Sequence, residues 1–366
     1  MKHEHAVQVA SRIVSIQQDY ANLKGSTILS LQHLFNFSHF DLDAFCKSFS
    51  PHPQSKLLSR SAKAFCDRYG IWLPNAEHYI SCALYLYPAA DLYRMETMLK
   101  NLAIGYYLND IMGRDLFKYL PAERQKGFAD MIHRMSAATP PFDNSNCRYP
   151  VENANMEMLE EVHHHSPSNW FSEFLPCFLR YLEITHRDCS CVSLGSILTV
   201  QEYIDMRYCT SGMGHIVLFI EFAEGNFLNW EWLHSKGIGD VLTGVHEATA
   251  LIGALMNDFF SFEKEVIDNN ADSNLLMAMA LNHPGLSLQQ LIDRCADTIR
   301  ALLKKYVDGV ELVKQVIDSE TGPEVHVLTR HLTGLDRCVQ ASWLWQVYTQ
   351  RYKRSNSIWK ETTLMQ

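Results

Sequence analysis

Apolar residues recur at helical spacing along most of the chain. Before Gly25, apolar positions such as Val7, Ile13 and Ile16 are spaced among polar residues at the interval that predicts an amphipathic helix. Further long helical patterns follow, separated by short runs rich in Pro, Gly, Ser and Asn, and none shows the strict alternation of a strand. Between Phe35 and Pro53 the chain is polar and aromatic, which predicts an extended strap. The pattern predicts on the order of ten or more helices in one all-α domain.

The composition indicates a folded protein with a large core. The 366 residues are 47% apolar and 20% charged, which excludes a disordered or fibrous chain. A net charge of −9 without a basic stripe argues against nucleic acid as a partner. The ten Cys are scattered without a CxxC pair, which is typical of reduced thiols. No apolar run reaches the roughly 18 residues that cross a bilayer, so we expect a soluble, cytoplasmic protein without a membrane span.

Three oxygen-bearing side chains share one face of a predicted apolar helix. Asn257, Ser261 and Glu265 are spaced by four residues, so successive members are offset by only about 40° around the helix. An amide oxygen, a hydroxyl and a carboxylate form a hard ligand set suited to Mg²⁺, which usually shares its shell with phosphate. A polar helix end would carry the same residues, so the pattern alone leaves both interpretations open.

A second acidic helix end lies upstream. A long helix that begins near Asp91 would carry Asn109 and Asp110 close to its C-terminus. The two residues could form a cap, because Asn and Gly are common where helices stop. A carboxylate at a helix C-terminus opposes the helix dipole, which favours a metal role for Asp110.

Two arginines lie where helical patterns end. The triplet Thr210-Ser211-Gly212 predicts a break in a helix, with Arg207 about one turn before it. An aromatic helix that contains Trp345 ends in Arg351-Tyr352. A guanidinium is well shaped to bind phosphate oxygens, although a single arginine is more often a surface or salt-bridging residue.

In this order and at these separations, the features resemble a microbial class I terpene synthase (terpene cyclase). Asn257-Asp258-x-x-Ser261-x-x-Lys264-Glu265 is similar to that family's NSE metal motif. Arg207-x-x-Thr210-Ser211-Gly212 resembles its pyrophosphate-sensor Arg, followed by the linker and effector residues at a helix break. Arg351-Tyr352 resembles its C-terminal Arg-Tyr pair. Leu86-Tyr87-Pro88, ahead of Asn109-Asp110, resembles the approach to its aspartate-rich motif.

The resemblance covers about residues 28–366 and leaves residues 1–27 as an N-terminal helical extension. It implies one catalytic domain with the class I terpenoid synthase fold, an all-α bundle around a central apolar active-site cavity. Dimers are common among relatives, so the resemblance also leaves a homodimer open.

The aspartate-rich motif departs from the family pattern. Asn109 stands where the family opens the motif with Asp, and Asp110 is kept. Arg114 stands where a later acid is usual, with Asp115 next to it. On an unbroken helix Asp115 lies about 140° around from Asp110, so it reaches the same metals only if the helix unwinds. The departure bears on metal affinity more than on the fold.

The resemblance implies a reaction and a role for each residue. The reaction is the Mg²⁺-dependent loss of pyrophosphate from farnesyl or geranylgeranyl diphosphate, followed by cyclisation to a terpene hydrocarbon or alcohol. Three Mg²⁺ are expected with the bound diphosphate. The implied metal ligands are Asn257, Ser261 and Glu265 for one ion and Asp110 for the others, with Asn109 and Asp115 as further candidates. The implied diphosphate-binding residues are Arg207, Lys264, Arg351 and Tyr352.

The carbocation that remains after ionisation must be folded and kept from water. Tyr106 and Trp345 are the candidate pocket residues, because aromatic faces attract a cation, although core packing would also explain them. In the family, the linker and effector correspond to Thr210 and Ser211, whose carbonyl would point at the cation. The departing pyrophosphate can take the final proton.

Other protein classes remain as alternatives. A chain-elongating prenyltransferase would carry a second aspartate-rich motif where this chain has Asn257 to Ser261. A helical isoprenoid-binding protein that has lost catalysis is indicated by Asn109 alone. A di-iron bundle needs two Glu-x-x-His helices, and only the run from Glu160 to His165 approaches one. His246-Glu247 lacks the second His of a metalloprotease helix.

Overall fold

The computed structural model describes residues 2–25, 28–113 and 116–364. Within these residues the chain forms helices with short links, and extended backbone pairs only in isolated bridges. The α-helices are α1 (Lys2–Leu23), α2 (Leu31–Phe35), α3 (Leu42–Cys46), α4 (Ser55–Tyr69), α5 (Ala76–Ile80), α6 (Cys82–Leu86), α7 (Leu92–Met112), α8 (Ala122–Ser136), α9 (Pro150–His164), α10 (Ser168–Thr185), α11 (Cys191–Leu194), α12 (Val200–Thr210), α13 (Met213–Glu224), α14 (Trp230–Ser235), α15 (Gly239–Phe262), α16 (Leu275–Asn282), α17 (Leu288–Ser319) and α18 (Pro323–Tyr348). Short 3₁₀ segments are η1 (Phe117–Tyr119), η3 (Gln350–Tyr352) and η4 (Lys360–Thr362).

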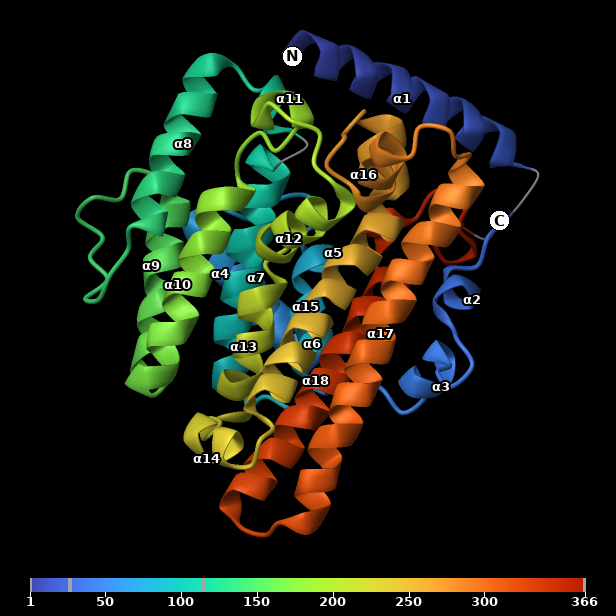
Figure 1. The fold of residues 1–366 in the computed structure, drawn as a ribbon. Helices are drawn as coiled ribbons and strands as arrows, with labels where there is room; N and C mark the ends of the chain where they lie inside the picture. The colour runs from blue at the N-terminus through green and yellow to red at the C-terminus, as the bar shows by residue number, and fades with distance from the viewer. Residues whose placement is uncertain (1, 26–27, 114–115, 365–366) are drawn as a thin grey trace.

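Helix α15 occupies the middle of the bundle. It packs against α12, α13, α17 and α18, and Figure 1 shows it between α13 and α17. Large side chains of its C-terminal half, such as Leu255, Phe259 and Phe260, are buried. A helix that is apolar nearly all round belongs in a core. No helix in the described part of the chain is both long enough and apolar enough to cross a membrane.

Two of the predicted helix ends at the motifs are present, whereas α18 ends at Tyr348 and Arg351-Tyr352 lie in the separate segment η3. Helix α7 runs from Leu92 to Met112, with Asn109 and Asp110 in its last turn. Helix α12 ends at Thr210 and α13 begins at Met213. Between them Gly212 has a φ of 77°, and a Cβ there would lie 3.1 Å from Cε2 of Tyr181. The left-handed backbone and the close ring both require glycine at this break.

The C-terminal end of α15 differs from the prediction of one regular helix. The α-helix ends at Phe262, and residues Glu263–Asp268 form a π-helix, η2. Lys264 and Glu265 therefore lie in a wider turn than their spacing from Asn257 suggested. Such π-segments often occur at functional sites.

The segment from Phe35 to Pro53 is less extended than predicted. It contains the short helix α3, which begins where the Asp41 carboxylate accepts the backbone N–H of Ala44 at 2.7 Å. Side-chain capping of this kind stabilises a helix start. Leu42 and Cys46 on α3 are buried, so packing supports a helix that the local sequence pattern did not reveal.

A buried ion pair joins three helices beside the break between α12 and α13. The carboxylate of Asp258, on α15, is fully buried. It accepts hydrogen bonds from Nε of Arg207 at 2.8 Å and from the Tyr203 hydroxyl at 2.5 Å, both on α12. It also accepts the backbone N–H of Leu275, the first residue of α16, at 2.9 Å. One carboxylate thus fixes α12, α15 and α16 relative to one another.

The N-terminal helix α1 lies across one end of the bundle, beside α16 (Figure 1). The buried guanidinium of Arg12 donates to the carbonyl oxygens of Ala280 at 3.1 Å and Leu286 at 2.7 Å. The Tyr20 hydroxyl donates to the buried carboxylate of Glu263 at 2.6 Å. Helix α1 is therefore packed onto the bundle and tied to the π-helix. The division of the chain at residue 27 stays a prediction.

We expect Asp258→Ala to lower the free energy of unfolding by about 3–5 kcal/mol, because it leaves the buried Arg207 guanidinium without its counter-ion. The measurement is urea unfolding followed by circular dichroism. Asp205→Ala is the matched control, since Asp205 lies exposed on α12 and its removal should cost less than about 1 kcal/mol. Equal losses for the two variants would contradict a structural role for the ion pair.

Candidate active site

One cavity of about 170 Å³ brings together nearly all of the site residues predicted from the sequence. Its walls come from α6, α7, α10, α12, α13, α15 and α18, together with the π-helix η2 and the segment η3. The predicted residues that line it are Tyr106, Asn109, Arg207, Thr210, Ser211, Asn257, Ser261, Lys264, Glu265, Trp345, Arg351 and Tyr352. Asp110 is not part of this lining. Asp115 lies outside the described residues.

The three oxygen-bearing residues all line this cavity, Asn257 and Ser261 from α15 and Glu265 from η2. The Asn257 amide nitrogen donates to Oε1 of Gln346 at 2.9 Å and to the Tyr352 hydroxyl oxygen at 2.7 Å. These contacts fix the orientation of the Asn257 amide. The Ser261 hydroxyl is buried and finds no hydrogen-bond partner among the described residues. Glu265 accepts a hydrogen bond from the Asn274 amide at 3.0 Å.

This donor set fits a Mg²⁺ ion. An amide oxygen, a hydroxyl and a carboxylate are the hard oxygen ligands that Mg²⁺ prefers. A buried hydroxyl that no described protein group satisfies is costly unless it has another partner. Ser261 is such a hydroxyl, and it lies in sequence between the other two ligands. The residues present therefore match the metal that the sequence predicts.

The end of α7 contacts the C-terminal segment directly, beside the cavity. Asn109 lines the cavity, and its amide donates to Asp110 at 3.2 Å. The Asp110 carboxylate pairs with the guanidinium of Arg351 at 3.0 Å. Arg351 also lies over the ring of Tyr79, with 4.4 Å to the ring centroid. Asp110 thus holds Arg351 in the cavity wall, a pairing that the sequence analysis did not foresee.

Arg207 is held at the helix break by two residues of α15. Its Nε donates to Asp258 at 2.8 Å, and its terminal nitrogen donates to Oδ1 of Asn257 at 2.9 Å. The side chain is almost fully buried yet lines the cavity. A guanidinium has five N–H donors, so these bonds leave capacity for an anion. The ion pair orients Arg207 next to the oxygen set.

Aromatic rings form part of the cavity wall. Tyr106 and Trp345 lie 6.0 Å apart between ring centroids, and Trp345 and Tyr352 lie 6.2 Å apart. The indole N–H of Trp345 donates to the Ser81 hydroxyl at 3.2 Å. Burial raises the pKa of Tyr106 well above its usual value, so its ring stays neutral. Neutral aromatic faces are suited to contact a cation.

The structure adds polar residues that the sequence analysis did not select. Asn101, His215 and Gln346 line the cavity. Asp258 lies outside this lining and orients Arg207 by accepting a hydrogen bond from its Nε. A signal for Asn101 existed, because it lies about two helical turns before Asn109 on the same helix. His215 lies on α13, beyond the break at Gly212, so helical spacing from Ser211 gives no such signal for it. Gln346 and Asp258 contact residues on helices that are far away in the sequence. The spacing of residues along one helix does not predict such contacts.

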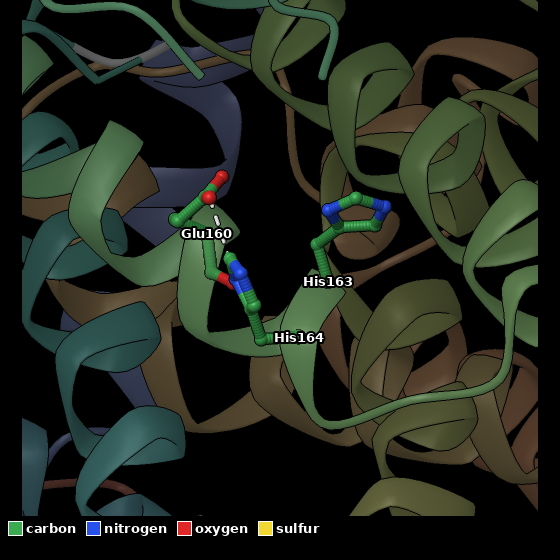
Figure 2. A group of neighbouring side chains, drawn as sticks. All are labelled: Glu160, His163 and His164. Atoms are coloured by element: carbon green, nitrogen blue, oxygen red, sulfur yellow. Dashed lines mark hydrogen bonds and ion pairs between the residues drawn. The ribbon is translucent and has the colours of Figure 1, made fainter. Parts of the chain in front are cut away.

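The His-rich end of α9 holds a separate group of potential ligands. Within the described ranges, Glu160, His163 and His164 are the one group of three His, Cys, Asp or Glu side chains whose ligand atoms, within 4.8 Å of one another, could share a metal ion. Figure 2 shows Glu160 next to His164, with the His163 ring set to the side. The His163 ring packs on Phe171 at 4.7 Å. A di-iron bundle needs a second such helix, and this group does not line the cavity.

The sequence is similar to a terpene synthase family model and to known terpene synthases. A family model described as terpene synthase family 2, C-terminal metal binding, matches residues 100–305. Sesquiterpene synthase 1 of Postia placenta is 26% identical over 159 residues, which cover 43% of this chain and 44% of that protein. The chain thus spans less than half the length of this curated relative. The (2Z,6E)-hedycaryol synthase of Kitasatospora setae is 24% identical over 242 residues, 65% of this chain and 68% of that protein.

A solved structure shares the fold. The linalool/nerolidol synthase from Streptomyces clavuligerus, in complex with 2-fluorogeranyl diphosphate, superposes with a TM-score of 0.67 at 15% identity. The superposition covers 81% of this chain and 100% of that chain. It confirms the predicted all-α terpenoid synthase fold. Because the family model matches more than half of the chain, the protein belongs to the terpene synthase family, as the resemblance in its motifs predicted.

Proposed function

We propose that the protein catalyses the Mg²⁺-dependent ionisation of a linear prenyl diphosphate and its cyclisation to a terpene hydrocarbon or alcohol, with release of pyrophosphate. The observation that carries this proposal is the single cavity in which an oxygen ligand set, basic side chains and aromatic rings meet. Two of the matched relatives are named sesquiterpene synthases. Farnesyl diphosphate is therefore the first substrate to test, ahead of geranylgeranyl diphosphate. A cytoplasmic location and a homodimer stay predictions.

The metal ligands in this proposal come from both sides of the cavity. Asn257, Ser261 and Glu265 would hold one Mg²⁺, and Asp110 would serve the others, with three ions expected when the diphosphate is bound. Bound Mg²⁺ would neutralise the charge that develops on the departing pyrophosphate. The orphaned Ser261 hydroxyl supports this assignment most directly. To bind the metal ions, Asp110 would have to break its ion pair with Arg351.

The diphosphate would be bound by Arg207, Lys264, Arg351 and Tyr352, which all line the cavity. Arg207 is already oriented by Asp258, so binding an anion costs it little conformational entropy. Preorganised donors of this kind stabilise the charge of the leaving group. Arg351 is paired with Asp110. Binding of the diphosphate to Arg351, or of metal to Asp110, would therefore change this ion pair.

The remaining wall would fold and shield the carbocation. Tyr106 and Trp345 present neutral rings, and each aromatic face can stabilise a cation by about 0.5–2 kcal/mol. Thr210 and Ser211 lie at the helix break that also holds Arg207, so the ionised carbon would form next to them. The backbone carbonyl of Ser211 is the proposed dipole that faces the cation.

The proposed function is tested by incubation with geranyl, farnesyl and geranylgeranyl diphosphate in Mg²⁺. We expect pyrophosphate release and a cyclic terpene in the extract, measured by a phosphate assay and mass spectrometry, and loss of both with EDTA. No turnover of any substrate at any Mg²⁺ concentration would favour a binding protein. A longer prenyl diphosphate formed after addition of isopentenyl diphosphate would favour chain elongation.

We expect Glu265→Gln to reduce kcat/KM by at least about 100-fold, because it removes a charged metal ligand while keeping the side-chain shape. The helical circular dichroism should not change. Glu247→Gln is the control, since Glu247 lies exposed on α15, the helix that precedes η2, and should behave as wild type. Retained activity in Glu265→Gln would remove this residue from the ligand set.

We expect Asn109→Asp to retain activity and to lower the Mg²⁺ concentration required for half-maximal rate. The change adds a carboxylate to the cavity wall, and carboxylates bind Mg²⁺ more strongly than amides do. Asn144→Asp adds the same charge on an exposed link and should leave the Mg²⁺ requirement unchanged. A large loss of rate in Asn109→Asp would mean that the amide itself has a specific role.

A further inference from the structure

Two neutral polar side chains, Asn101 and His215, interrupt the apolar part of the cavity wall. Asn101 comes from α7 and His215 from α13, so two separate helices bring them together. Both line the cavity, and they are only 4% and 2% exposed. Their sequence neighbours in the lining, Leu102 and Ile216, are apolar. No part of the proposed metal and diphosphate chemistry uses either residue.

The hydrogen bonding of this pair is incomplete. Nε2 of His215 lies 3.4 Å from Oδ1 of Asn101, which is long for a hydrogen bond between these atoms. Nδ1 of His215 is buried and has no hydrogen-bond partner in the described part of the chain. The ring is surrounded by Phe178 and Tyr181, at 5.2 and 5.0 Å between centroids. A contact this long leaves Nε2 and Oδ1 short of a full hydrogen bond, so a small polar ligand can complete their hydrogen bonding.

The imidazole of His215 is neutral at physiological pH. Burial among aromatic rings lowers its pKa to about 3, because the charged form would lose its solvation. A neutral imidazole carries one N–H and one lone pair. In the tautomer that carries its hydrogen on Nδ1, Nε2 is an acceptor beside the acceptor Oδ1 of Asn101. Two adjacent acceptors can receive the two hydrogens of one water molecule.

We propose that Asn101 and His215 bind a water molecule that captures the carbocation, so that this enzyme releases a terpene alcohol. This inference rests on the proposed function, because it needs a carbocation in the same cavity. Both side chains line the cavity, and one buried water requires only roughly 10–15 Å³. The two acceptors would orient the water with its oxygen lone pairs toward the cavity.

The chemical step is balanced. The water oxygen donates a lone pair to the cationic carbon and forms a C–O bond, which gives a protonated alcohol. That oxonium transfers a proton to Nε2 of His215, because a protonated alcohol is a much stronger acid than an imidazolium. The neutral alcohol leaves, and the imidazolium returns the proton to solvent. His215 acts as the catalytic base and Asn101 positions the water.

The test uses the full-length protein with farnesyl diphosphate and Mg²⁺ in water enriched in ¹⁸O. Pyrophosphate release and the ratio of terpene alcohol to hydrocarbon are measured separately, the latter by mass spectrometry. We expect the wild type to release an alcohol that carries ¹⁸O. His215→Phe and Asn101→Leu should each lower the alcohol-to-hydrocarbon ratio at least about tenfold, while pyrophosphate release stays within about threefold. Two variants on different helices guard against a folding defect in one.

His186→Phe is the matched control. His186 is also buried, packs on Tyr181 at 5.6 Å between centroids, and has both ring nitrogens unpaired among the described residues. It does not line the cavity, so its replacement should not change the product ratio. Pyrophosphate release with only hydrocarbon, or an unchanged ratio in both variants, would overturn the water site and leave the proposed function intact. No pyrophosphate release from the wild type would overturn both.

Discussion

The buried pair of Asp258 and Arg207 is the interaction on which the rest of the site depends. A carboxylate and a guanidinium are costly to remove from water, and only a full set of hydrogen bonds offsets that cost. Tyr203 and the backbone of Leu275 complete the set around Asp258. The pair therefore forms only when α12, α15 and α16 have docked together, which also brings Asn257 next to Arg207.

The polar groups of the cavity fall into two kinds. The first kind is charged or tightly bonded: Asn257 is held by Gln346 and Tyr352, Glu265 by Asn274, and Arg351 by Asp110. These contacts hold the groups in place before any ligand arrives. The second kind is neutral and underbonded, as in Ser261, His215 and Thr210, which each have a polar atom without a partner among the described residues. These atoms keep a free hydrogen-bonding position for a ligand, whether a metal ion at Ser261 or a small polar molecule at His215.

The sequence was sufficient to predict an all-α fold and many of the polar residues that line the cavity. Residues such as Asn257 and Ser261 lie on one helix, and helical geometry alone places them on one face. The break after Thr210 follows from glycine chemistry, which is also local. The π-helix at Glu265 was not predictable in this way, since its widened turn is supported by contacts of Glu263 with Tyr20 and Ser357, far away in the sequence. The pairing of Asp110 with Arg351 and the meeting of Asn101 with His215 depend equally on tertiary packing.

The buried carboxylate of Glu263 also joins the two ends of the chain. Tyr20, near the N-terminus, donates to one of its oxygens, and Ser357, near the C-terminus, donates to the other. Backbone hydrogen bonds between Leu29 and the segment Ile358–Lys360 add to this connection. The two terminal segments are therefore held together at Glu263, next to the turn that bears Lys264 and Glu265. Loss of either terminal segment would leave the buried Glu263 carboxylate without one of its hydrogen-bond donors, directly beside Lys264 and Glu265.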